Sequence, residues 1–156
     1  NAGAVASLPL SVAGEGPGQP AQLISQASLW DLEQRFREHG LEPMAAYDAR
    51  ALEEPWLPHT REWTRHAAQA LALCIVNGTA FLDIDAVVVD GSFSRAMLTR
   101  LIDHTEAALA HYDWEGLWPA TLIAGSIGSD ARALGGALLP LHENFAPDRD
   151  IFLKAS

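Results

Sequence analysis

The sequence predicts an α/β fold in which helices cover a parallel β-sheet. Two short apolar runs, at residues 86–89 and 121–124, have no polar alternation, which is typical of strands buried on both faces of such a sheet. A glycine-containing turn and then a helical pattern follow each run. Strand, helix, strand and helix in succession are the pattern of a βαβ unit.

Helices are predicted where apolar residues recur at helical spacing. The strongest pattern covers residues 63–78, and its second half is apolar almost all round, so we expect this helix to be covered on both sides. A second helix is predicted over residues 22–38. Between residues 42 and 59 the prolines leave room only for a short helix at residues 48–53.

The two ends of the chain carry weaker patterns. Residues 4–12 alternate loosely and precede a Gly/Pro cluster at residues 14–20, which predicts a strand followed by a loop. Between the two apolar strands, Ser92 or Ser94 is expected to cap a helix. A last helix is expected over residues 131–144.

Composition excludes several classes of protein. The chain has 156 residues, a net charge of −10 and a single cysteine, Cys74. A chain of this length forms one domain or a large part of one. A lone cysteine excludes an internal disulfide and a zinc site built of cysteines. The acidic balance argues against wrapping DNA, and no apolar run reaches the roughly 20 residues that cross a bilayer.

The turns after the two apolar strands are the first candidate site. Gly91 and Ser92 follow the first strand, and Gly125 and Gly128 follow the second. In parallel sheets, ligands bind beyond the carboxyl ends of strands, where glycines let backbone amides approach a phosphate. Neither turn has a Walker lysine or a full GxGxxG pattern, so ordinary strand-to-helix turns remain the alternative.

Other reactive or aromatic residues have simpler structural explanations. None of the six histidines pairs with another at i+4, so surface or capping positions are expected. Cys74 lies on an apolar helical face and is expected to be a small core residue. The three tryptophans near the prolines are Trp30, Trp56 and Trp63. They are expected to be packing anchors, and any of them that is exposed would mark a partner surface.

Five short segments stand out in order along the chain: AGAVASLPL at 2–10, QLISQAS at 22–28, ALALCIVN at 70–77, VVVDG at 87–91 and DARALGGA at 130–137. In this order and spacing they resemble the C-terminal half of the ROK family of repressors, open reading frames and sugar kinases, and its transcriptional regulators most closely. The resemblance implies the actin-like ATPase fold, which is hexokinase-like and ribonuclease H-like. Residues 1–156 would then be one α/β domain of a longer protein whose N-terminal half is absent.

The resemblance also implies a degenerate sugar pocket. Where the family's kinases carry Gly-Glu-x-Gly-His and then Leu-Glu, the matching positions here are Ala4, Ser7 and Ile24. Each unpartnered sugar hydroxyl costs about 1–3 kcal/mol, so a family-type sugar should bind poorly. The family's zinc site needs that histidine and a cysteine cluster, which residues 14–20 replace, so we expect no zinc.

The resemblance also implies that the nucleotide site is altered and that this chain has no catalytic residue. The family's Gly-Gly pair at the nucleotide is Gly91-Ser92 here, so these residues, Gly125 and Gly128 would be remnants of a nucleotide site. The family's catalytic Asp belongs to the N-terminal half, so we assign no catalytic residue to this chain.

Two functions follow from the resemblance. The first is the effector-binding and oligomerisation domain of a sugar-responsive ROK-type transcriptional regulator, which would be cytoplasmic and homo-oligomeric. It would bind a sugar or sugar derivative, and DNA only through a missing N-terminal winged helix-turn-helix. The alternative is the C-terminal domain of a divergent ATP-dependent sugar kinase.

Overall fold

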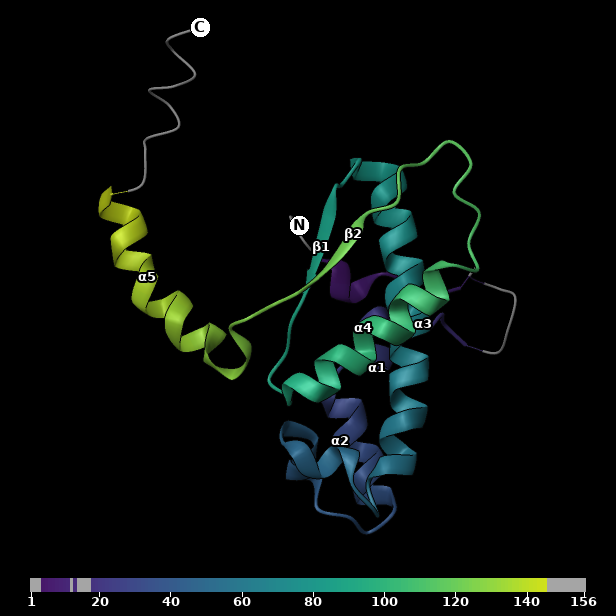
Figure 1. Ribbon diagram of the computed structural model, residues 1–156, viewed down its shortest axis with the longest axis vertical. Helices are drawn as coiled ribbons and strands as arrows, with labels where there is room; N and C mark the ends of the chain where they lie inside the picture. Colours follow the sequence, from purple (N-terminus) through teal and green to yellow (C-terminus); the bar gives the residue numbers. More distant parts are fainter. Residues whose placement is uncertain (1–3, 12, 14–17, 146–156) are drawn as a thin grey trace, which may run out of the picture.

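The chain folds around one long helix. The computed structural model describes residues 4–11, 13 and 18–145. Figure 1 shows α3 as the central rod, with α2 and α4 packed along it and two strands beside its C-terminal end. The α-helices are α1 (Leu23–Ala27), α2 (Leu29–Glu38), α3 (Leu57–Leu82), α4 (Arg95–Leu109) and α5 (Ala131–Phe145), and the strands are β1 (Ala86–Val89) and β2 (Thr121–Ala124).

Helix α3 confirms the strongest helical prediction and extends it at both ends. Pro58 lies in its first turn, where a missing N–H costs nothing. Asp83 ends the helix in the left-handed conformation, with φ of 49°, and its N–H donates to the carbonyl of Thr79. Trp63, at 1% exposure, is its largest buried side chain. The helix is therefore the central element of the core.

Two apolar clusters form along α3. The larger one joins Leu32 and Phe36 of α2 to Trp63 of α3 and Met97 of α4. Trp56 packs against the same cluster, so Trp56 and Trp63 are packing anchors as predicted. The same prediction is wrong for Trp30, which is 64% exposed. The second cluster lies nearer the strands and contains Ala72, Ile75, Leu109 and Ala120.

The two strands pair in parallel, as predicted, but they are not buried on both faces. Ala86 pairs with Thr121 and Val89 with Ala124, and α4 connects the strands. Val87 and Leu122 pack against the helices. Their neighbours Val88 and Ile123 are paired with each other and stay 64% and 45% exposed. The prediction of burial on both faces is wrong, because no described element covers the outer face.

The expected single helix over residues 22–38 is broken at Ser28. This residue has extended backbone angles, and its Oγ accepts from the N–H of Asp31 as the N-cap of α2. The carbonyl of Ser28 accepts from the indole N–H of Trp63 at 3.1 Å. The backbone carbonyl at the break in the predicted helix is therefore hydrogen-bonded to a side chain of α3.

The expected strand over residues 4–12 is also wrong. The described part of this segment forms a 3₁₀ turn, η1 (Val5–Ser7), followed by an isolated antiparallel bridge between Pro9 and Gln22. The short helix predicted at residues 48–53 is confirmed as the 3₁₀ helix η3 (Ala49–Leu52). A second 3₁₀ helix, η2 (Pro43–Tyr47), precedes it and was not predicted.

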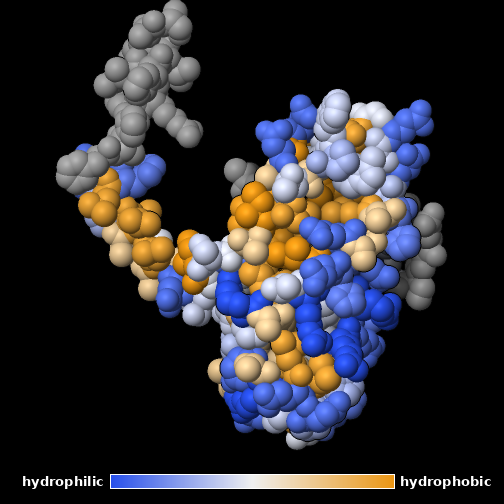
Figure 2. Space-filling model, in the orientation of Figure 1, coloured by the Kyte–Doolittle hydropathy of each residue, from blue (hydrophilic) through white to orange (hydrophobic). Residues whose placement is uncertain are grey.

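The last helix, α5, begins after the short 3₁₀ turn η4 (Gly128–Asp130). Figure 1 shows it extending away from the rest of the molecule. Its leucines are about half exposed, from 43% at Leu134 to 68% at Leu139. Figure 2 shows apolar surface along this helix and over the region of the strands. No helix among the described residues combines the length and apolar character needed to cross a membrane.

Candidate functional site

The turns after β1 and β2 meet in space, as expected for the carboxyl ends of parallel strands. Asp90, the residue directly after β1, reaches across to the second turn. Its Oδ2 accepts from the backbone N–H of Ile127 at 3.0 Å and from that of Gly128 at 2.8 Å. Its Oδ1 accepts from the N–H of Gly91 at 2.8 Å. The amides that could cradle a phosphate here already bind a carboxylate of the chain itself.

Arg95, in the first turn of α4, completes this arrangement. Its Nη1 donates to Asp90 Oδ1 and to the carbonyl of Gly125, each at 2.9 Å. Its Nη2 donates to the carbonyl of Gly91 at 2.9 Å. The guanidinium thus joins the first turn, the second turn and the carboxylate between them. We call Asp90, Arg95 and the backbone groups that they bind the loop clamp.

The loop clamp explains the charge state of Asp90. The N–H of Gly128 lowers the pKa of this carboxyl most strongly, and the Arg95 guanidinium and the N–H groups of Gly91 and Ile127 add to it. The pKa of Asp90 therefore lies well below its ordinary value. A carboxylate that stays ionised at neutral pH repels a second anion at the same amides.

The clamp also explains why glycines stand in both turns. A Cβ on Gly125 would lie 2.5 Å from the Cβ of Asp90, and one on Gly91 would overlap the ring of Phe93. Gly128 has φ of +65°, a conformation that L side chains rarely adopt. Packing at Gly91 and Gly125 and the backbone conformation of Gly128 thus favour glycine at all three positions. Ser92 is exposed on the first turn.

The sequence pointed to these turns but not to Arg95. An Asp directly after a strand and an Arg one residue after the N-cap Ser94 are local signals that could have found the pair. The contact of Asp90 with Ile127 and Gly128 spans 37 and 38 residues, so spacing alone does not reveal it.

The expected sugar-pocket positions lie on the surface. The segments that carry them are adjacent, because the N–H of Leu23 donates to the carbonyl of Leu8 at 2.9 Å. Ala4 and Ser7 are exposed, and neither lines the hollow of about 270 Å³ on which Ile24 lies. Ser28 provides the only hydroxyl among the residues that line this hollow. The hollow offers a sugar no carboxylate.

Metal and thiol chemistry have little support in the described part of the chain. No group of three His, Cys, Asp or Glu side chains there could hold a metal ion. Most of the loop expected to replace the zinc ligands, residues 14–17, lies outside the described residues. Cys74 is partly buried, and burial raises the pKa of its thiol, which makes it a poor nucleophile.

Comparisons with protein-family models and with curated proteins found no match for this chain. The resemblance to the ROK family therefore rests on the five sequence segments, and the actin-like architecture stays a prediction.

Proposed function

We propose that residues 1–156 act as the non-catalytic, effector-binding and oligomerisation part of a ROK-type transcriptional regulator. The observation that carries this proposal is the loop clamp. In it, the backbone amides at the carboxyl ends of β1 and β2 bind Asp90 rather than facing solvent.

The clamp argues against nucleotide binding on energetic grounds. A phosphate at these amides would have to displace a carboxylate that accepts three backbone N–H bonds and pairs with Arg95 at 2.9 Å. It would also bring a second negative charge to the same place. In a chain that lost nucleotide binding but kept the fold, a carboxylate at these amides would supply the hydrogen bonds that the phosphate no longer makes.

The surface at Ala4, Ser7 and Ile24 supports the same proposal. Hexose recognition needs polar groups that pair with the hydroxyls of the sugar. The hollow at Ile24 is lined mainly by apolar side chains such as Leu23 and Leu71. A sugar kinase must hold its acceptor hydroxyl in line with the γ-phosphate, and these side chains give no such orientation.

The oligomerisation part of the proposal rests on exposed apolar surface. Parallel strands are normally covered on both faces, whereas Val88 and Ile123 form an exposed pair on the outer face of β1 and β2. Trp63 is 1% exposed and Trp56 packs against the same core, so neither of them marks a partner surface. We therefore assign self-association to the outer face of the strands.

Two measurements test the proposal. The first is the sequence encoded upstream of this chain, where we expect a basic helix-turn-helix segment of about 60 to 80 residues. The complete protein would then be a cytoplasmic DNA-binding protein. The second is a coupled kinase assay on the complete protein with glucose, mannose and N-acetylated hexoses. Turnover within the usual kinase range of about 1 to 100 per second would reject the regulator in favour of the sugar kinase.

A further inference from the structure

A groove runs between α3 and α4, on a part of the molecule separate from the loop clamp. It has a volume of about 410 Å³. Ala68 of α3 and Ala107 and Ala108 of α4 line it where the two helices pack. Because these side chains end at Cβ, they leave space that larger residues would fill. We call this hollow the α3–α4 groove.

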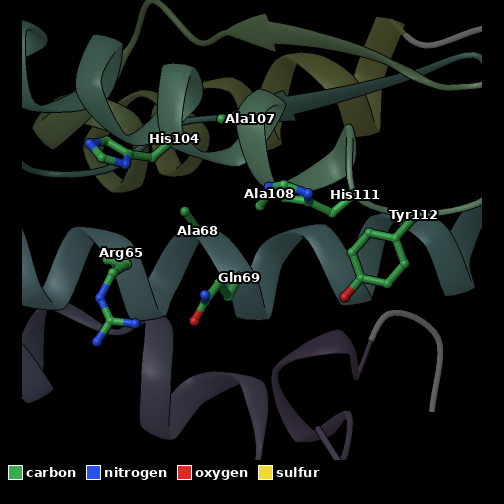
Figure 3. A pocket seen from close by; sticks show the side chains of 8 residues that line it. All are labelled: Arg65, Ala68, Gln69, His104, Ala107, Ala108, His111 and Tyr112. Atoms are coloured by element: carbon green, nitrogen blue, oxygen red, sulfur yellow. The ribbon is translucent and has the colours of Figure 1, made fainter.

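Polar side chains line the rest of the groove. Arg65 and Gln69 lie one turn apart on α3, His104 lies on α4, and His111 lies in the turn that follows α4. Figure 3 shows Arg65 and Gln69 on α3 and His104 on α4, with His111 and Tyr112 in the chain that follows α4. No Asp or Glu lines the α3–α4 groove. The site therefore combines one permanent cation with two imidazoles.

The charge of Arg65 is not neutralised locally. Among the described residues, Arg35, Arg37 and Arg95 each pair with a carboxylate, and Arg65 has no carboxylate oxygen within 4.0 Å. Its nearest polar partner is an imidazole nitrogen, with Nη2 lying 2.6 Å from His66 Nε2. In a chain with 20 acidic and 10 basic residues, a cationic groove without carboxylates favours an anionic ligand.

A second hollow continues from the first. It has a volume of about 380 Å³ and shares Gln69 and Tyr112 with the α3–α4 groove. Ser11 and Gln26 add a hydroxyl and an amide, and Leu73 adds an apolar side chain. Amides and hydroxyls both donate and accept hydrogen bonds, as sugar hydroxyls require.

We propose that these two hollows bind one small organic anion that has a phosphate or carboxylate head and a hydroxylated body. The head binds beside Arg65, and the body lies against Gln69 and Tyr112 toward the second hollow. A guanidinium matches both kinds of head, because it donates two parallel hydrogen bonds to either. Only the role of this ligand as an effector rests on the proposed function, and binding itself is tested separately.

Calorimetric titration of the 156-residue chain tests the site with four probes. Glucose 6-phosphate and gluconate carry the two kinds of head on a hydroxylated body, inorganic phosphate is a head alone, and glucose is a body alone. We expect at least one of the two hydroxylated anions to bind with a Kd of about 1 mM or tighter, and the tighter of them identifies the head. Inorganic phosphate should bind more weakly, and glucose should give no heat of binding.

Two variants locate the binding. Arg65→Gln should weaken the tighter anion at least about tenfold, since a charge-assisted bidentate contact is lost. Arg61→Gln, one turn earlier on the same helix and outside the groove, should change the Kd less than about twofold. Thermal melting of both variants checks that they fold. The proposal is overturned if neither hydroxylated anion binds, if glucose binds as well as they do, or if both variants weaken binding equally. Equal affinity for inorganic phosphate would remove the second hollow from the site.

Discussion

Replacing Gly125 by alanine tests whether the loop clamp is as tightly packed as the distances indicate. The new Cβ would lie 2.5 Å from Asp90 Cβ and 2.6 Å from its Cγ and Oδ2, closer than real Cβ atoms come to other heavy atoms. Asp90 must then move, although three backbone N–H groups and Arg95 hold it. Overpacking of this kind costs about 1–3 kcal/mol. Because about 1 kcal/mol shifts the melting temperature of a chain of this size by roughly 2–4 °C, we expect Gly125→Ala to melt roughly 2–12 °C lower.

Gly78→Ala is the matched control. Gly78 lies within α3, and a Cβ there would make an ordinary contact of 3.6 Å with Ile84 Cδ1. Alanine in a helix is more stable than glycine by about 0.5–1 kcal/mol, so this variant should melt slightly higher than the parent. The same chemical change thus has opposite signs at two positions, and differential scanning calorimetry measures both.

A double-mutant cycle identifies the cause of the loss. All three atoms that the new methyl group would meet belong to the side chain of Asp90. In an Asp90→Gly background, Gly125→Ala should therefore cost much less than in the parent. The reasoning is refuted if Gly125→Ala melts at or above the parent temperature, or if its cost is the same in both backgrounds.

Three further predictions address charge, assembly and metal. Because the folded-state pKa of Asp90 is lowered, its contribution to stability is complete above the ordinary Asp pKa of about 3.9 and is lost as pH falls below it. The urea midpoint of the parent should then fall more steeply below about pH 4 than that of Asp90→Asn, and parallel slopes would contradict this. Light scattering should detect a dimer or larger oligomer of the parent. The double variant Val88→Lys, Ile123→Lys should be monomeric, whereas the control Met44→Lys, also at an exposed residue, should still associate. A strictly monomeric parent would reject the interface. Elemental analysis of protein purified without added metal should find no stoichiometric zinc, and one zinc per chain would reject the alignment at Ser7.

Local signals were sufficient for the strands and for the main helices. The apolar runs of β1 and β2, the apolar face of α3 and the Ser94 cap of α4 are all determined by residues close in sequence. The parallel pairing followed from the helix between the strands, because a parallel connection needs a crossover of that length. These parts of the fold were predictable without any tertiary contact.

Long-range contacts decided what the sequence did not predict. The break between α1 and α2 lies where Ser28 accepts from Trp63, 35 residues away. The loop clamp depends on Asp90 reaching the second turn. The α3–α4 groove depends on which faces of two helices meet, so neither Arg65 nor His104 was distinguishable from an ordinary surface residue. Periodicity predicts that a face is apolar or polar, but not which distant face it meets.

The exposed apolar surface is large enough to affect stability. Fully burying a Val, Leu or Ile side chain is worth about 1.5–3 kcal/mol, and Val88 and Ile123 are each about half exposed, so covering both gives roughly 2 kcal/mol. The exposed leucines of α5 would add a similar amount or more. A typical domain is stable by about 5–15 kcal/mol in total, so covering these surfaces would be a substantial fraction of it. Self-association through the outer face would therefore stabilise the fold, and its stability would depend on protein concentration.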